Sequence, residues 1–171
     1  MNKYIFFKTI FLYFLICHPG FSSAQIVDLS RASIIASSTI AHPVRETAIR
    51  VLQEEVAQRT FINLRVISKF GNAPVIVLAS IKDDEINGMP VPKRTGEIFP
   101  EMKAEGFRIV LTQSKGKDVL WLIGADERGV IFAIGNFLRT VELSKKKILF
   151  NKVNEIATSP AYPIRGHQLG Y

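Results

Sequence analysis

The stretch Val119-Leu120-Trp121-Leu122-Ile123-Gly124-Ala125-Asp126-Glu127-Arg128-Gly129 carries the strongest fold signal in this chain of 171 residues. Its first five residues are all apolar, as in a strand that is covered on both faces. Asp126 is a favourable N-cap for a helix, and apolar side chains then recur at helical spacing as far as Val141. The stretch therefore predicts a buried strand that turns sharply into a helix.

The junction at residues 124–129 lies between a strand and a helix, which is also where phosphate-binding loops lie. It lacks the Gly-Lys-Ser/Thr ending of such loops, and Asp126 and Glu127 would repel a phosphate at the helix N-terminus. We therefore interpret its two glycines as positions of close packing between the strand and the helix.

Working outward, residues 43–58 predict a second helix, because Val44, Ala48, Leu52 and Val56 share one face. Further strands are predicted at residues 33–38, 63–70, 74–79, 106–112 and 148–150. The order of these elements predicts an α/β chain, an α+β sandwich in which one mixed β-sheet carries two helices packed on one face. The other face of the sheet would then be uncovered and available for docking.

Residues 81–105 show no sustained period and contain several Gly and Pro residues, which predicts a long loop that is either functional or disordered. Asp83, Asp84 and Glu85 are the densest acids of the chain, and we interpret them as a solvated part of this loop. No apolar neighbour in the sequence would raise their pKa for acid–base work.

Residues 1–24 are typical of a secretory signal peptide. Lys3 and Lys8 supply positive charge before an apolar core at residues 10–17. Ser22-Ser23-Ala24 then supplies the small residues needed for cleavage before Gln25. The protein is therefore expected to be exported, either to the periplasm or to the extracellular cell surface.

Two alternatives for this segment are a membrane anchor and a lipid anchor. The apolar stretch at residues 4–17 is shorter than the roughly 20 residues that span a bilayer. Lipidation at Cys17 is disfavoured by Ile16, since a small residue should precede the acceptor. Cys17 is the only cysteine of the chain, so its removal with the signal peptide leaves the exported part without disulfide or thiol chemistry.

Removal of residues 1–24 takes away two lysines and lowers the net charge from +7 to +5, which is mild and spread along the chain. For an exported protein of this charge, no nucleic-acid partner is expected. His18, His42 and His167 lie far apart, and no Gly-x-Ser-x-Gly elbow occurs. We expect no metal, no cofactor and no catalytic residue in this chain.

The segment Ser159-Pro160-Ala161-Tyr162-Pro163-Ile164-Arg165-Gly166 is typical of a linker that leads into a new domain. Arg165 is the candidate substrate-binding residue, because a guanidinium can donate paired hydrogen bonds to sugar or carboxylate oxygens. On spacing alone, a surface arginine in a linker is the simpler interpretation.

Four segments carry a family resemblance: Glu105-Gly106-Phe107-Arg108-Ile109, the junction 124–129, Phe137-Leu138-Arg139 and residues 159–166. Together they resemble the N-terminal non-catalytic domain of exo-acting glycoside hydrolases, of the family 67 α-glucuronidase and family 20 β-hexosaminidase type. In these families a mixed sheet with two helices on one face precedes a (β/α)8 barrel that holds the catalytic acids. In the hexosaminidase pattern an arginine at the position of Arg165 contacts sugar hydroxyls. In this chain His167-Gln168-Leu169 follows, which departs from the residues that come after this arginine in hexosaminidases. The departure favours the glucuronidase-like branch.

After the predicted signal peptide (1–24), the resemblance implies an accessory α/β domain (25–157) and a linker with the first strand of a truncated catalytic barrel (158–171). The implied function is an accessory, non-catalytic role in a secreted glycoside hydrolase that degrades polysaccharide. Its partners would be the downstream barrel of its own chain and, through the parent enzyme, a carbohydrate. The alternative is a stand-alone carbohydrate-binding or protein-interaction module at the cell envelope. An exposed Trp121 beside Phe107 would favour the sugar-binding alternative.

Overall fold

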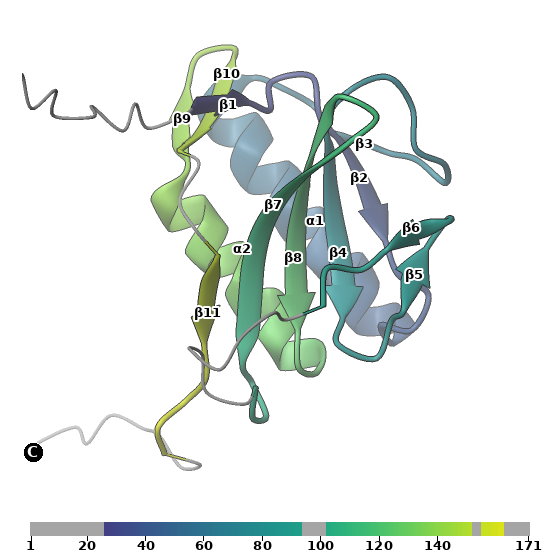
Figure 1. The fold of residues 1–171 in the computed structure, drawn as a ribbon. Coiled ribbons are helices and arrows are strands. Elements are labelled where there is room, and N and C mark those ends of the chain that lie inside the picture. Colours follow the sequence, from purple (N-terminus) through teal and green to yellow (C-terminus); the bar gives the residue numbers. More distant parts are fainter. Residues whose placement is uncertain (1–25, 94–101, 152–154, 163–171) are drawn as a thin grey trace, which may run out of the picture.

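A six-stranded mixed sheet forms the centre of the computed structural model, which describes residues 26–93, 102–151 and 155–162 (Figure 1). The order of its strands is β11-β7-β8-β4-β2-β3. Their bounds are β2 (Ser33–Ala36), β3 (Arg65–Val66), β4 (Val75–Ser80), β7 (Phe107–Ser114), β8 (Lys117–Gly124) and β11 (Ile156–Thr158). The strands β3, β2, β4 and β8 run parallel, whereas β7 pairs antiparallel with both β8 and β11. The predicted mixed sheet is confirmed.

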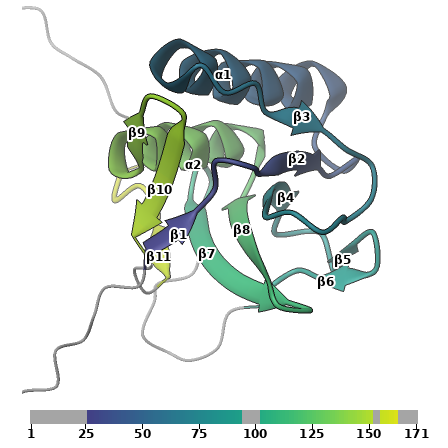
Figure 2. The ribbon, with the colours of Figure 1, turned by 90° about the horizontal axis from the view of Figure 1, so that it is seen from above.

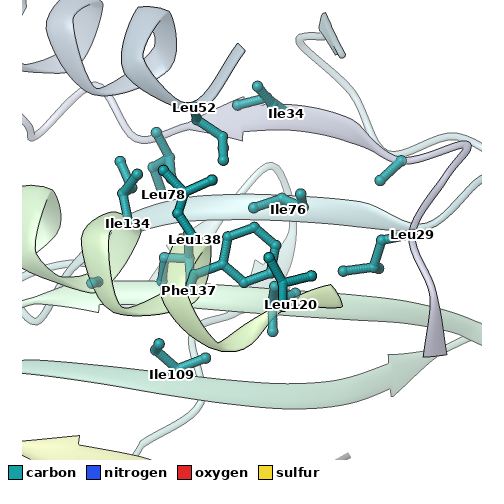
Figure 3. Close-up of a cluster of buried hydrophobic side chains, with 14 of the residues drawn as sticks. Leu29, Ile34, Leu52, Ile76, Leu78, Ile109, Leu120, Ile134, Phe137 and Leu138 are labelled. Atoms are coloured by element: carbon teal, nitrogen blue, oxygen red, sulfur yellow. The ribbon is translucent and has the colours of Figure 1, made fainter. Parts of the chain in front are cut away.

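Helices α1 (His42–Thr60) and α2 (Glu127–Thr140) cover the same face of this sheet, as Figure 2 shows from above. Alternate strand residues such as Ile76 and Leu120 point toward Leu52 of α1 and Phe137 of α2 (Figure 3). All four side chains are fully buried. The α+β arrangement with both helices on one face is therefore confirmed.

Helix α1 follows the predicted apolar stripe. Ala48, Leu52, Val56 and Thr60 are buried at intervals of four residues, which places them on one side of the helix. The helix ends at Phe61, whose left-handed backbone (φ of 60°) lets its N–H donate to the carbonyl of Ala57.

The sequence analysis predicted that the other face of the sheet is uncovered, and this prediction is wrong. The chain after β4 folds back as a small hairpin of β5 (Glu85–Ile86) and β6 (Met89–Pro90), seen opposite the helices in Figure 2. Ile86 and the following Val91 are buried against Trp121 of β8. A second apolar cluster therefore lies beneath this hairpin, and residues 81–93 are not the loop without secondary structure that their composition predicted.

Two strand predictions need correction. Residues 148–150 do form a strand, β10 (Lys147–Asn151), but it pairs with β1 (Ile26–Asp28) and β9 (Glu142–Ser144) in a separate three-stranded sheet. Phe150 packs on Phe137 of α2, with ring centroids 5.8 Å apart, so this sheet closes one end of the core. The strand predicted at residues 63–70 is reduced to β3, whose two residues are exposed at the sheet edge.

Within the described residues, neither helix is both long enough and apolar enough to cross a bilayer.

Candidate functional site

The strand–helix junction at residues 124–129 is a packing and capping motif, as predicted. The side chain of Asp126 accepts the N–H of Gly129 at 2.8 Å, which caps α2, and its second oxygen accepts the N–H of Glu105 at 2.9 Å. A Cβ at Gly129 would lie 2.2 Å from the carbonyl oxygen of Gly106, closer than real side chains approach. Because an acid already occupies the helix N-terminus, the junction is not an anion site.

Asp83 differs from the solvated acid that the sequence predicted. It is buried, and its Oδ1 accepts the hydroxyls of Ser37 and Thr39, each at 2.8 Å. Its Oδ2 accepts the N–H of Ser80 at 2.8 Å. This carboxylate joins the chain beyond β2 to the end of β4, so it holds two strand ends together rather than serving a reaction.

Asp84 and Glu85 are exposed, as predicted for both. Asp84 forms an exposed ion pair with Lys93 at 2.8 Å. The hydrogen bond from Lys93, together with its charge, lowers the pKa of Asp84, and the same contact raises the pKa of Lys93. The pair closes a loop at the surface.

Arg108 is a buried cation that the sequence did not single out. It forms an ion pair with Glu155 and donates to the carbonyl of Pro92 at 3.1 Å, while its Nη2 has no hydrogen-bond partner in the part of the chain that the structure describes. It borders a pocket of about 350 Å³ that Asp83 and Asp84 also line. Among the described residues, Glu155 is the carboxylate that pairs with its positive charge.

A larger groove of about 830 Å³ lies beside the β5–β6 hairpin. We define this hairpin groove by residues 68–73, residues 87–90 and the turn around Lys115, with Val75 and Val119 at its base. Its volume falls within the range of small-molecule sites. Three segments that are distant in the sequence thus meet around one concavity.

Two tight turns shape the hairpin groove. Asn87-Gly88 has φ values of 51° and 78°, and Lys115-Gly116 has φ values of 49° and 73°. Two successive positive φ angles are the mark of two-residue type I′ hairpins. Asn87 also donates its side-chain N–H to the carbonyl of Ser68 at 2.8 Å, which ties one wall of the groove to the other.

The polar rim of the hairpin groove is cationic. Lys69, Lys115 and Lys117 are exposed, and no Asp or Glu lines the groove. Within the described residues, none of these lysines forms an ion pair. The rim therefore concentrates positive charge around a partly apolar base that includes Phe70 and Met89.

The other candidate site residues that the sequence analysis singled out are either outside the described residues or buried away from the groove lining. Arg165 lies outside the described residues, as do the cleavage site before Gln25 and the acceptor Cys17. Trp121 is 1% exposed and donates its indole N–H to the hydroxyl of Thr112 at 2.8 Å, so it offers no sugar-stacking platform. Among the residues that the structure describes, no three metal-binding side chains come together.

Sequence reasoning missed the hairpin groove, although part of its signal was present. The dipeptide Asn87-Gly88 is a hairpin signal. Nothing in the local pattern indicated that this turn and the turn at Lys115-Gly116 would lie near each other.

No family model and no curated protein matches the chain. Among solved structures, its fold is similar to part of BtGH115A, a family GH115 4-O-methyl-α-glucuronidase with specificity for decorated arabinogalactans, at a TM-score of 0.54 and 19% identity. That match covers 80% of this chain and 18% of the enzyme. A second match is the Flavobacterium johnsoniae chitobiase FjGH20, at a TM-score of 0.48 and 15% identity, over 84% of this chain and 21% of that one.

The chain thus spans about a fifth of the length of each of these proteins. The first match shows that this α/β fold occurs within a glycoside hydrolase. The likeness that the sequence segments indicated is therefore supported at the level of fold, without deciding between the α-glucuronidase and β-hexosaminidase branches.

Proposed function

We propose that this chain is a non-catalytic accessory domain of a secreted glycoside hydrolase, of the α-glucuronidase-like or β-hexosaminidase-like type. The observation that carries the proposal is the shared fold with part of BtGH115A over 80% of this chain. The sequence segments at residues 105–109 and 124–129 support it independently, because both form the packed junction between β7, β8 and α2.

In this proposal the partner of the domain is a catalytic (β/α)8 barrel in the same polypeptide, and the carbohydrate is bound by the parent enzyme. The domain supports the barrel, and Arg165 at the entrance to the barrel contacts the sugar. The signal peptide directs export and is removed before Gln25.

The non-catalytic role is tested with the purified chain and two chromogenic substrates, a 4-nitrophenyl α-glucuronide and a 4-nitrophenyl N-acetyl-β-glucosaminide. We expect no nitrophenol release above that of the heat-denatured chain, because the acids described above cap a helix, accept structural hydrogen bonds, form ion pairs or are exposed. Turnover that scales with the concentration of folded chain would overturn the non-catalytic assignment.

The accessory role and the export are tested in the organism that makes the protein. An antibody raised against the chain should detect, in the exported fraction, a polypeptide several times larger than 19.2 kDa. Its first residue should be Gln25 when the N-terminus is sequenced. A band no larger than 19.2 kDa would instead support the stand-alone alternative.

The stand-alone alternative is a carbohydrate-binding or protein-interaction module at the cell envelope. The hairpin groove favours its carbohydrate-binding form, since it is ligand-sized and combines an apolar base with polar side chains. The two roles are compatible if the accessory domain itself holds sugar.

A further inference from the structure

We infer that the hairpin groove binds an acidic oligosaccharide, one whose sugar rings bear the carboxylate of a hexuronic acid. The sugar part of this inference rests on the proposed function. The carboxylate part rests on the charges of the groove itself.

The charge of the groove selects an anion. Lys69 comes from the loop before β4, Lys115 from the β7–β8 turn and Lys117 from the start of β8. With no acid in the lining and no ion pair to these lysines among the described residues, their field adds over one concavity. An ammonium on a flexible stem can follow a carboxylate whose position varies between ligands.

The uncharged side chains of the groove suit a sugar rather than a simple ion. Phe70, Met89 and Val119 give it an apolar base, on which the C–H face of a sugar ring can pack. Asn72 and Ser114 provide amide and hydroxyl groups beside that base, and these can both donate to and accept from sugar hydroxyls. An inorganic phosphate would leave the apolar base uncovered.

The groove is also preorganised, which lowers the entropy lost on binding. Its two hairpin tips are short type I′ turns, and the amide of Asn87 holds the loop at Ser68 in place. Beneath it, Val75 and Val119 are buried neighbours on the paired strands β4 and β8.

The test uses isothermal titration calorimetry of the purified chain with tetragalacturonic acid. The matched ligand is the fully methyl-esterified tetramer, which keeps the sugar rings but removes their charge. We expect binding of the acid and at least tenfold weaker binding of the ester. Raising the salt from about 0.1 M to about 1 M should weaken acid binding, because the Debye length falls from about 10 Å to about 3 Å.

The matched protein variants are the double substitution Lys69→Gln/Lys117→Gln and the control Lys145→Gln. Lys145 is exposed in the turn between β9 and β10 and does not line the groove. The double variant should bind the acid about tenfold more weakly, equivalent to about 1.4 kcal/mol, whereas the control should bind like the unsubstituted chain. Both variants alter exposed side chains, and circular dichroism verifies that they are folded.

A second readout does not depend on variants. Tetragalacturonic acid should shift the backbone amide resonances of Gly71, Gly88 and Gly116, which lie in or beside the three walls of the groove. Shifts confined to other parts of the chain would overturn the assignment even if binding is measured.

Three further results of the titrations would contradict binding of an acidic oligosaccharide in the hairpin groove. No binding of the acid, equal binding of the ester, or tighter binding of a single-stranded oligonucleotide of equal charge would each overturn the inference. The chromogenic assay and the size of the exported polypeptide are unaffected by these results. Failure here is therefore distinguishable from failure of the proposed accessory role.

Discussion

Two glycines of α2 allow a matched test of the packing at the strand–helix junction. A Cβ at Gly129 would lie 2.2 Å from the carbonyl oxygen of Gly106 and 3.1 Å from the Cα of Gly124. A Cβ at Gly135, in the same helix, would meet no atom within 4 Å. We expect Gly129→Ala to destabilise the fold and Gly135→Ala to stabilise it.

The magnitude follows from the two environments. Both substitutions gain about 1 kcal/mol of helix propensity, because alanine loses less backbone entropy on folding than glycine. At Gly129 the crowded Cβ adds an overpacking cost of about 1–3 kcal/mol. The displaced carbonyl of Gly106 also accepts the N–H of Ala125 at 2.9 Å, and weakening this bond costs about 1 kcal/mol. Gly129→Ala should therefore lose about 1–3 kcal/mol, and Gly135→Ala should gain about 1 kcal/mol.

The assay is urea unfolding followed by the fluorescence of Trp121, the only tryptophan of the chain. Its side chain is 1% exposed in the folded state, so unfolding changes its environment strongly. The midpoint should fall for Gly129→Ala and rise for Gly135→Ala, with the slope unchanged in both because the exposed area is the same.

Equal midpoints for the two variants would refute this reasoning. That result would mean that the contact among Gly106, Gly124 and Gly129 is looser than the structure shows. The interpretation of the junction as a close-packing motif would then fail with it.

Three further predictions concern acids with different surroundings. Asp83→Ala should lower the free energy of unfolding by about 3–4 kcal/mol, because the buried donors of Ser37 and Ser80 and the exposed hydroxyl of Thr39 lose one charged acceptor. Urea unfolding measures this loss, and a value below about 1 kcal/mol would contradict the hydrogen-bond network around Asp83. Asp126→Ala should lower the free energy of unfolding by about 2 kcal/mol, because the N-cap of α2 is lost. In circular dichroism, its helix content should then fall at a lower temperature on heating, and an unchanged melting curve would argue against the cap. The lowered pKa of Asp84 means that its pair with Lys93 stabilises the fold above the unfolded-state pKa of 3.8 and stops doing so as the pH falls through the lower folded-state pKa. Asp84→Asn should thus flatten the acid limb of the stability curve, and an unaltered limb would show that the pair is not formed in solution.

The local elements of this fold could be read from the sequence wherever one strong pattern dominated. The apolar run at residues 119–123 and the stripe through Ala48, Leu52 and Val56 both became the predicted elements. The N-cap at Asp126 was also predicted correctly, since a cap depends on residues only a few positions away. By contrast, the strand at residues 63–70 was overextended, because its alternation continued beyond the edge pairing available to it.

The candidate site could not be predicted to the same degree. Asp83 was interpreted as solvated because its sequence neighbours are polar, yet its partners Ser37 and Thr39 lie more than 40 positions earlier. The hairpin groove likewise requires that residues 68–73 and the turn at Lys115 be brought together by β4 and β8.

Local sequence patterns were sufficient to predict the helices, the buried strands, the strand–helix junction and the mixed α/β class. These features follow from periodicity, turn residues and capping, all of which act over a few neighbouring residues. Three other features became visible in the folded chain alone: the β5–β6 hairpin covers the second face of the sheet, β10 joins a separate sheet, and three lysines surround one groove. These features depend on contacts between distant segments, and the free energy of such contacts comes from shared burial that no local pattern records.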